Sequence, residues 1–408
     1  MSTFSNHGLL FDTIVIGAGP AGLAAAYASV KSGKKVLVIE KMPRPGLKLL
    51  ASGGGRCNVT NALPLEEFAG RFGRYWRFLL PALSRFHGKT MLDFFQHHGV
   101  PLTLSDGLHY FPASGKAGDI LQLFLAELGN NIICNEKITA LKFQNGVWLL
   151  TASSGKIYRT KKVVCACGGR GYPALGGSMA GYTLAETLGH TVTPLYPSMT
   201  GVIAADPRVG ECAGISLPDC IASIAVKGCK IPPQRGELLF THRGFSAFAI
   251  LDLAGNIAGL LTERPSVPLK IDFLPEVSAA DLENEFESWR KKGGTVKVSH
   301  LLGKYLPRRA ALLLLNGDDP EISRWKAASS RMLLQKLKGA IFEISGTEPW
   351  EKAMVTYGGV SLKEVDPETL ESKKFPGLFF AGEMLDVTGP CGGFNITWAL
   401  ASGMTAGR

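Results

Sequence analysis

The chain has no apolar run of the roughly 18 residues needed to cross a bilayer. Its first eight residues, 1–8, contain no charged stretch followed by an apolar block, so no signal peptide is predicted. None of the eight cysteines forms a C-x-x-C pair, and neither a zinc site nor a thioredoxin-like redox pair is predicted. Cys165 and Cys167 lie two apart in an expected strand, about 6.5 Å between Cα atoms, near the limit for a disulfide. These absences predict a reduced, cytoplasmic protein without a metal site.

Long basic runs are also missing, although the net charge is +10 and the pI is near 9.1. The tightest groups are Arg290-Lys291-Lys292 and Arg308-Arg309, and neither alternates with aromatic residues that could stack on bases. Nucleic acid is therefore not the expected partner, and a solvated basic face that attracts an anionic ligand is the preferred interpretation. With 408 residues, 46% of them hydrophobic, the chain can bury a large core in two or three domains.

Near its N-terminus the chain has a glycine-rich turn between two apolar runs, 13–16 and 36–39. Glycines in such a turn permit a tight bend, a close backbone approach to a pyrophosphate and close packing of the next helix, expected over about 21–31. Glu40 follows the last glycine by 18 positions, close to where a carboxylate accepts hydrogen bonds from an adenosine ribose. A purely structural turn is the alternative, but the order of elements predicts a dinucleotide-binding βαβ unit. Its turn consists of Gly17, Ala18, Gly19, Pro20, Ala21 and Gly22.

The C-terminal segment repeats this kind of pattern. An apolar strand, 377–383, ends in Gly382-Glu383, and a short loop leads to Gly392-Gly393-Phe394-Asn395 and a helix over about 396–404. A ligand that is held by both ends of the chain is an extended one, which favours FAD over a nicotinamide dinucleotide. Helix N–H groups near this turn would stabilise negative charge on a reduced flavin. An ordinary glycine-rich turn remains the alternative.

Between these segments lies a run of three glycines, 53–55, followed by Arg56, Cys57 and Asn58. The glycines would allow the backbone to approach a ligand closely, while Arg56 and Asn58 could supply hydrogen bonds. The alternative is a flexible loop. Cys57 lacks a nearby second cysteine, so a packing role is preferred to a redox role, and a Cys57–Cys391 pair is a minor hypothesis.

The periodicity of the apolar residues changes along the chain. We expect a first part of a nucleotide-binding domain over 1–190, a β-rich, barrel-like domain over 191–276 and a helical domain over 277–338. Residues 339–408 then return through the β-rich domain to the nucleotide-binding domain. Helices are expected over 80–87, 90–98, 117–128, 279–291, 296–306 and 329–337, and a hairpin is expected over 138–152.

Taken together, the motifs resemble the BaiN-like NAD(P)/FAD-dependent oxidoreductases, also known as aminoacetone-oxidase-like flavoproteins. The resemblance covers nearly the whole chain and rests on the segments 17–22, 52–61, 111–120, 166–173, 240–246, 355–373 and 376–399. It implies an α/β fold: a glutathione-reductase-like, Rossmann-type FAD-binding domain with an inserted β-barrel and a small helical domain. The chain departs from the family pattern at Met179-Ala180-Gly181, at Ser246-Ala247-Phe248 and at Thr388-Gly389, which puts a transferred substrate in doubt.

The motifs also provide candidate site residues. Arg56, Asn58 and His242 are the candidate catalytic residues, with His109 as a further acid–base candidate. A structural role is the preferred interpretation for each histidine, and for Arg56 it is an equal alternative to a ligand contact. The expected FAD-binding set is the turn 17–22 together with Glu40, Lys41, Lys48, Ser52, Gly54, Gly55, Arg56, Cys57, Asn58, Ile138, Ala166, Gly168, Gly169, Gly382, Glu383, Asp386, Gly392, Gly393, Phe394, Asn395 and Ile396.

A second glycine fingerprint for NAD(P)H is absent. The flavin is therefore expected to be reduced by NAD(P)H that visits an open site, by the substrate or by another protein. The leading hypothesis is an FAD-dependent oxidoreductase acting on a small organic molecule. The alternatives are an RNA-directed flavoprotein, similar in architecture to flavin-dependent tRNA-modifying enzymes, and a non-catalytic flavin sensor. The sequence does not indicate an oligomeric state.

Overall fold

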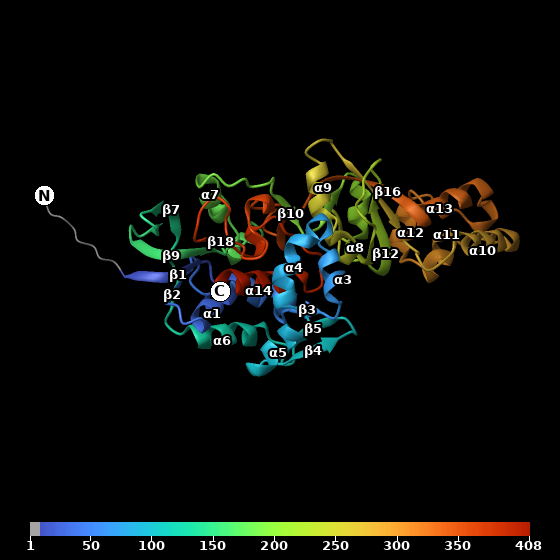
Figure 1. Cartoon of the computed structure of the whole chain (residues 1–408). Helices are drawn as coiled ribbons and strands as arrows, with labels where there is room; N and C mark the ends of the chain where they lie inside the picture. The colour runs from blue at the N-terminus through green and yellow to red at the C-terminus, as the bar shows by residue number, and fades with distance from the viewer. Residues whose placement is uncertain (1–8) are drawn as a thin grey trace. The chain divides into compact units, whose positions relative to one another are not determined.

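The computed structural model describes residues 9–408. The segment 1–8, for which no signal peptide is predicted, lies outside the described residues. The chain forms two compact units (Figure 1): unit 1 contains Met1–Leu195 and Val355–Arg408, and unit 2 contains Tyr196–Met354. No helix in the described range is both long and apolar enough to span a membrane.

The core of unit 1 is a seven-stranded mixed sheet in the order β6-β2-β1-β9-β8-β7, with β18 also paired to β9. Strands β1, β2, β6, β9 and β18 are parallel, while β7, β8 and β9 form an antiparallel meander. The carboxyl ends of β1, β2, β9 and β18 therefore meet at one edge, where open α/β sheets bind ligands. The strands are β1 (Leu10–Ile16), β2 (Val36–Ile39), β6 (Ile132–Ile133), β7 (Ile138–Gln144), β8 (Val147–Ala152), β9 (Ile157–Cys165) and β18 (Leu378–Phe380).

Helices and a small second sheet surround this core. The sheet has the order β3-β5-β4. Its strands are β3 (Thr60–Asn61), β4 (Leu102–Ser105) and β5 (His109–Pro112); β17 (Val355–Tyr357) also belongs to unit 1. The helices are α1 (Pro20–Lys31), α2 (Leu47–Ala51), α3 (Leu65–Gly70), α4 (Trp76–Arg85), α5 (Lys89–His97), α6 (Ala117–Leu128), α7 (Ala180–Thr187) and α14 (Phe394–Gly407), with short 3₁₀ turns η1 (Ser52–Gly55), η2 (Gly73–Tyr75), η3 (Pro173–Leu175), η7 (Leu362–Glu364) and η8 (Gly382–Met384).

Helix α14 lies inside unit 1, because 12 of its 14 residues are buried. It packs on α1 through glycines: a Cβ on Gly403 would lie 2.2 Å from the Ala21 carbonyl oxygen, and one on Gly407 would lie 2.1 Å from that of Ala25. Both distances are too short for any side chain, so the two helices approach backbone to backbone. The last helix of the chain is thus fixed against the first.

Unit 2 is built on a closed six-stranded barrel in the order β11-β14-β13-β12-β15-β16. Four helices, α10 to α13, lie in sequence between the paired strands β15 and β16. The elements are β10 (Tyr196–Ser198), β11 (Val202–Ala204), η4 (Pro207–Cys212), β12 (Ser216–Ile224), β13 (Gln234–Phe240), β14 (Gly244–Ser246), α8 (Phe248–Leu251), α9 (Ala254–Leu260), β15 (Val267–Asp272), α10 (Ala279–Lys292), α11 (Val298–Leu301), η5 (Leu302–Lys304), α12 (Arg308–Leu314), η6 (Ile322–Arg324), α13 (Ala327–Gly339) and β16 (Ala340–Thr347).

This architecture confirms the expected fold class, an α/β Rossmann-type domain combined with a β-barrel and a small helical part. The division into four domains by residue number stays a prediction. All eight cysteines lie among the described residues and are free thiols, so neither the Cys165–Cys167 nor the Cys57–Cys391 pair is bridged.

Candidate functional site

The glycine turn after β1 is shaped by contacts that exclude side chains. A Cβ on Gly17, whose φ is +101°, would lie 2.5 Å from the Ala166 carbonyl oxygen, and one on Gly22 would lie 1.9 Å from the Gly17 carbonyl oxygen. Gly19 differs, because a Cβ there would meet no atom within 4 Å. It is the N-cap of α1, and no side chain caps that helix. The turn therefore leaves open space at Gly19, next to the N-terminus of α1, where the unbonded N–H groups of Ala21 and Gly22 suit an anion; Pro20 has no N–H to offer.

Glu40 stands at the mouth of this turn. Its side chain is buried, and Oε2 accepts the Ala18 N–H at 2.6 Å while Oε1 accepts the Met42 N–H at 2.8 Å. Each carboxylate oxygen keeps a further lone pair for a ligand hydroxyl. Sequence reasoning placed an acid here, and the structure brings it to the turn.

Two further predicted residues lie close to Glu40. Lys41 Nζ donates to Ser178 Oγ at 2.5 Å, and burial lowers the pKa of Lys41. Ile138 is buried at the start of β7, just after Glu136, whose N–H donates to the Glu40 carbonyl at 3.0 Å. The structure therefore brings both residues to the Glu40 side of the site.

The triple-glycine segment forms η1 and holds Gly53, Gly54 and Gly55 at φ values of 56°, 65° and 88°. Glycine takes these values without steric cost. Ser52 Oγ fixes the start of the segment by donating to the Leu49 carbonyl at 2.6 Å. Arg56 is exposed and lies over the Phe111 ring at 4.7 Å.

Asn58 and Cys57 behave differently at the end of this segment. The Asn58 Oδ1 atom is buried and has no hydrogen-bond partner, which leaves an acceptor directed at nothing in the protein. Burial raises the pKa of the Cys57 thiol to about 11 against an opposing hydrogen bond with Ser52. Cys57 therefore stays protonated at neutral pH, where it is a poor nucleophile.

At the C-terminal strand the acidic residue Glu383 joins several segments. It forms an ion pair with Lys48 of α2 at 2.7 Å and accepts the Thr356 N–H at 2.7 Å. A Cβ on Gly169 would lie 2.2 Å from Glu383 Oε1, so Gly169 is required for this approach. Gly168 and Gly382 adopt φ values of 71° and 66° beside it.

The loop before α14 contacts the triple-glycine segment. A Cβ on Gly393 would lie 2.9 Å from the unpaired Asn58 Oδ1, and one on Gly392 would lie 3.0 Å from His109 Nε2. Asn61 Nδ2 donates to the Gly392 carbonyl at 2.8 Å. Two segments more than 300 residues apart thus form one glycine-lined surface.

Helix α14 begins with predicted site residues. Asn395 accepts the Gly389 N–H at 2.9 Å and donates to the Gly389 carbonyl at 2.8 Å, so its amide holds the preceding loop. Phe394 stacks on Phe68 at 4.6 Å, and Ile396 is half-buried. Asp386 lies in the same loop, half-way between β18 and α14 in sequence.

One predicted catalytic residue belongs to the other unit. His242 belongs to unit 2, where it is exposed in the turn between β13 and β14. It is not among the residues of unit 1 that form the glycine-lined surface. Within residues 9–408, no group of three histidine, cysteine, aspartate or glutamate side chains could hold a metal ion.

Sequence reasoning missed Thr356 and Tyr182. Thr356 Oγ1 accepts the Arg170 N–H at 2.8 Å, and Tyr182 donates to the Glu383 carbonyl at 3.0 Å. Asn61 was also missed. Thr356 and Asn61 lie inside the segments that carry the family resemblance, and this was the one available signal; for Tyr182 no signal was present.

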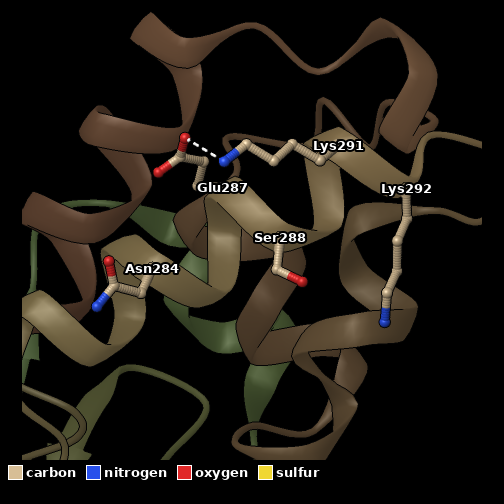
Figure 2. Close-up of a pocket in the computed structure, with 5 residues that line it drawn as sticks. All are labelled: Asn284, Glu287, Ser288, Lys291 and Lys292. Carbon is tan, nitrogen blue, oxygen red and sulfur yellow. Dashed lines mark ion pairs between the residues drawn. The ribbon is translucent and has the colours of Figure 1, made fainter.

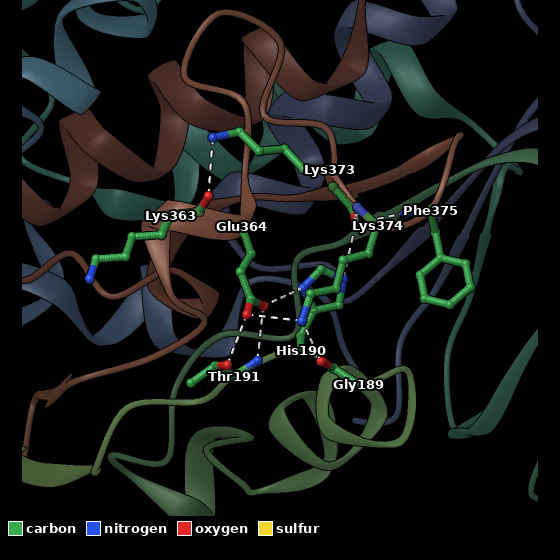
Figure 3. Close-up of polar contacts among 9 residues, drawn as sticks. Gly189, His190, Thr191, Lys363, Glu364, Lys373, Lys374 and Phe375 are labelled. Carbon is green, nitrogen blue, oxygen red and sulfur yellow. Dashed lines mark hydrogen bonds and ion pairs between the residues drawn. The ribbon is translucent and has the colours of Figure 1, made fainter.

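A second polar cluster in unit 1 joins a glutamate, a histidine and a serine by hydrogen bonds, the order found in a catalytic triad; Figure 3 shows its His190 and Glu364. His190 is buried, with Nδ1 3.1 Å from Glu364 Oε2 and Nε2 3.0 Å from Ser372 Oγ. Ser372 Oγ, however, also accepts the N–H groups of Lys374 and Phe375 and is buried. A hydroxyl so enclosed cannot reach a substrate, so the cluster is a structural clasp between 189–191 and 364–375.

Charge in this clasp is balanced. Burial raises the pKa of Glu364, but hydrogen bonds from Lys374 and Thr191 outweigh it and hold the pKa at about 2. Burial lowers the pKa of His190 in spite of Glu364. The clasp is therefore built for an ionised carboxylate beside a neutral imidazole.

The fold and the glycine-lined site define a Rossmann-type nucleotide-binding protein. Residues 11–408 match the family described as "HI0933-like protein Rossmann domain". The chain is 31% identical to a 3-dehydro-bile acid delta(4,6)-reductase of Clostridium scindens over 97% of both chains, and 32% identical to a ribosomal RNA dihydrouridine synthase of Escherichia coli over 96% of both chains. A ribosomal RNA dihydrouridine synthase of Haemophilus influenzae is 30% identical, again over 96% of both chains.

Solved structures agree on the fold. A flavocytochrome c3 fumarate reductase in its open conformation aligns with a TM-score of 0.51 at 16% identity, covering 98% of this chain and 78% of that chain. The chain belongs to the HI0933-like family of Rossmann FAD-binding proteins, which confirms the resemblance drawn from the motifs. It is an FAD-dependent oxidoreductase.

Proposed function

We propose that the protein reduces a carbon–carbon double bond conjugated with a carbonyl group in a ring, and that its substrate is a small organic molecule. The observation that supports this is full-length similarity to two kinds of enzyme that share one type of reaction. One name describes reduction of ring double bonds in a keto bile acid. The other describes formation of dihydrouridine, which is uridine with its ring double bond reduced.

The residues at the sheet edge fit FAD. The open N-terminus of α1 at Gly19 suits the pyrophosphate, and Glu40 retains lone pairs for the ribose hydroxyls. The orphaned Asn58 Oδ1 suits an N–H donor on the flavin ring, since a buried acceptor without a partner is costly. The remaining residues proposed to line the site are Lys41, Lys48, Ser52, Gly54, Gly55, Arg56, Cys57, Ile138, Ala166, Gly168, Gly169, Gly382, Glu383, Asp386, Gly392, Gly393, Phe394, Asn395 and Ile396.

When bound, FAD supplies the hydride that reaches the double bond. The chain's residues hold and orient the reactants. Lys48 and Glu383 form an ion pair in which the two charges cancel. This pair joins α2 to η8 and keeps both segments at the site. Arg56 is fixed by the Phe111 ring with its guanidinium exposed, where it can hold the carbonyl oxygen of a substrate. His109 is the proposed proton donor, because Asp106 orients its Nδ1 at 2.9 Å and Nε2 faces Gly392. His242 stays a proposal for a residue that contacts the substrate.

NADH or NADPH is proposed as the reductant. It would bind only transiently, because the chain's single dinucleotide fingerprint is assigned to FAD. The test is the visible spectrum of the purified protein, followed by anaerobic addition of each nucleotide and then of cyclohex-2-enone. We expect flavin bands that bleach with one nucleotide and return with the enone, but not with cyclohexanone as the control. A colourless protein that also refuses added FAD would contradict the proposal.

Asn58 provides a sharper test of the site. Asn58→Ala removes the orphaned acceptor, and one hydrogen bond to a ligand is worth about 1 kcal/mol, or roughly fivefold in FAD affinity. The control is Asn131→Ala, an exposed residue on the loop before β6. Equal FAD affinity of both variants and the parent would remove Asn58 from the site.

Uridine in RNA is a second substrate candidate. Two full-length relatives are named ribosomal RNA dihydrouridine synthases, and the net charge of +10 favours a polyanionic partner. Incubation with NADPH and ribosomal RNA, followed by nucleoside mass spectrometry, tests it. Formation of dihydrouridine supports the RNA substrate, and turnover of the enone alone supports the small molecule.

A further inference from the structure

Positive charge is concentrated in one part of unit 2. Residues 290–338 contain twelve lysines and arginines against three aspartates and glutamates, a net charge of +9 in a chain whose total is +10. The rest of the chain is therefore close to neutral. Short basic runs in the sequence do not reveal this, because the cations are distributed over the end of α10, over α12 and α13, and over the turns and segments between them.

Backbone pairing brings several of these cations together. The segment after α10 lies beside the segment before α13: the Ser323 N–H donates to the Gly294 carbonyl at 3.0 Å, and the Ile322 N–H donates to the Val296 carbonyl at 2.9 Å. Lys292 and Lys297 flank the first segment, and Lys326 follows the second as the N-cap of α13. All three lysines are exposed.

Two surface hollows continue this region. One of about 300 Å³ lies between α10 and α13, and its charged lining residues are Arg290 and Arg331 together with Glu283 and Glu287. A second of about 410 Å³ is lined by Asn284, Glu287, Ser288, Lys291 and Lys292, and Figure 2 shows Lys291 held by Glu287 while the Lys292 side chain extends away from that ion pair. The Nε atom of Arg290 is buried without a hydrogen-bond partner, so this guanidinium has an unused donor.

The cations that lack acidic partners define the basic face: Arg290, Lys292, Lys297, Lys326 and Arg331. Among the described residues, none of them has a carboxylate oxygen within 4.0 Å, whereas Lys291 and Lys304 are paired with Glu287 and Glu285. One cation at the end of α10 would suffice to offset the helix dipole. A face of five unpaired cations is therefore in excess of what the fold requires.

We infer that the basic face docks the phosphate backbone of RNA. This inference rests on the second substrate candidate above, uridine in RNA. Three aromatic residues of α10 and the segment before α13, Phe286, Trp289 and Trp325, are buried against one another and cannot stack on bases. The face therefore holds phosphates without reading sequence, and the choice of nucleotide is left to the flavin site.

The test uses the full-length, FAD-loaded protein and a fluorescent RNA hairpin with a uridine loop. The variant carries Lys292→Glu, Lys326→Glu and Arg331→Glu, and the matched control carries Lys89→Glu, Lys142→Glu and Lys156→Glu, three exposed lysines of unit 1. Both change the net charge equally. We expect the Kd for the hairpin to rise at least tenfold for the variant alone. The slope of log K against log salt should become shallower, its magnitude decreasing by about two to three units.

Equal weakening by the control, or no weakening by the variant, overturns the inference. So does equally tight binding of phosphatidylglycerol vesicles that competes with the hairpin, because the face would then recognise a membrane surface. Reduction of cyclohex-2-enone at the parent rate shows that the variant is folded and its flavin site intact. If the parent binds RNA through this face but forms no dihydrouridine, the docking surface stands and uridine fails as the substrate.

Discussion

Two segments, one in each unit, hold unusual backbone conformations in different ways. In unit 1, the segment 53–55 places glycine at three successive positive φ values. In unit 2, Ala247 adopts φ 71° and ψ −175°, a region that is close to exclusive to glycine. The segment of unit 1 adopts its shape at no steric cost, whereas the loop of unit 2 is held in shape by its surroundings. The first arrangement suits a surface that must admit a ligand, and the second stores strain beside an exposed Phe248.

The largest effect is expected at Gly22 of unit 1, where the surrounding backbone leaves no room for a side chain. Gly22→Ala places a Cβ 1.9 Å from the Gly17 carbonyl oxygen, so the turn after β1 must move. We expect flavin content to fall at least tenfold. The control is Gly33→Ala, at φ +71° with no atom within 4 Å, which costs about 1 kcal/mol in unfolding free energy and leaves flavin bound. Full flavin content in Gly22→Ala would break the comparison.

Acid sensitivity should also separate the units. Burial lowers the pKa of His87 in unit 1 to about 4, so the unfolded chain binds more protons between pH 6.5 and 4 and stability falls as the pH is lowered through that window. His87→Phe should recover about 2 kcal/mol of unfolding free energy at pH 4.5 and little at pH 7. His87 Nε2 has no partner and the ring packs on Phe68, so an apolar ring fits there.

Urea unfolding midpoints at the two pH values measure this effect. The matched control is His300→Phe in unit 2, because His300 is exposed. Its midpoint should change equally at both pH values. An unchanged acid sensitivity in His87→Phe would place the titrating group elsewhere, with His190 as the next candidate.

The loop before α14 offers a third way to fix a backbone conformation. Here the side chain of Asn395 holds the loop by hydrogen bonds, and no special glycine conformation is needed for that contact. Asn395→Ala removes both hydrogen bonds to Gly389 and leaves the loop free to shift. We expect FAD affinity to fall roughly tenfold, which corresponds to about 1.4 kcal/mol. Asn395→Asp keeps the acceptor and should lose less. Isothermal titration of the apoprotein with FAD measures both, and equal affinity of Asn395→Ala and the parent would contradict the assignment.

The smallest expected effect is a gain in stability. Ala247→Gly relieves the strained conformation in unit 2, and we expect the unfolding free energy to rise by about 1 kcal/mol, after the larger chain entropy of glycine is counted. Ala328→Gly on the exposed face of α13 should have the opposite sign, with a loss of similar size. Guanidinium unfolding of both variants decides the matter. If Ala247→Gly is destabilised as well, the loop holds no strain.

Much of the fold could be predicted because its signals are local. The glycine turn, the acid after β2 and the apolar run of β9 each lie in short windows, and α6 has the expected bounds of 117–128. Pro81 misled the prediction of α4, which spans Trp76–Arg85 and not 80–87, because proline here lies in the helix interior and not in its first turn. The expected helix over 296–306 breaks into α11 and η5, since residues 294–297 pair with the segment before α13.

The candidate site was less accessible from the sequence, because its geometry depends on contacts between distant segments. Thr356 and Tyr182 meet Glu383 only through the fold, and no spacing rule relates them. For Cys57 the sequence favoured a packing role over a redox role, but the raised pKa of the thiol, about 11, follows from its burial and could not be read from the sequence. Ala247 could be noticed as a departure from the family pattern, but its strain depends on a dihedral angle that the sequence does not contain.

The burial of α14 against α1 has a consequence for synthesis on the ribosome. Unit 1 needs residues from both ends of the chain, and all of unit 2 is translated between them. At about 5 to 20 residues per second, the first half of unit 1 waits roughly 10 to 40 s for its final helix. During that interval the face of α1 that receives Gly403 and Gly407 is uncovered. The α1 face and the glycine-lined surface therefore stay incomplete until α14 has been translated.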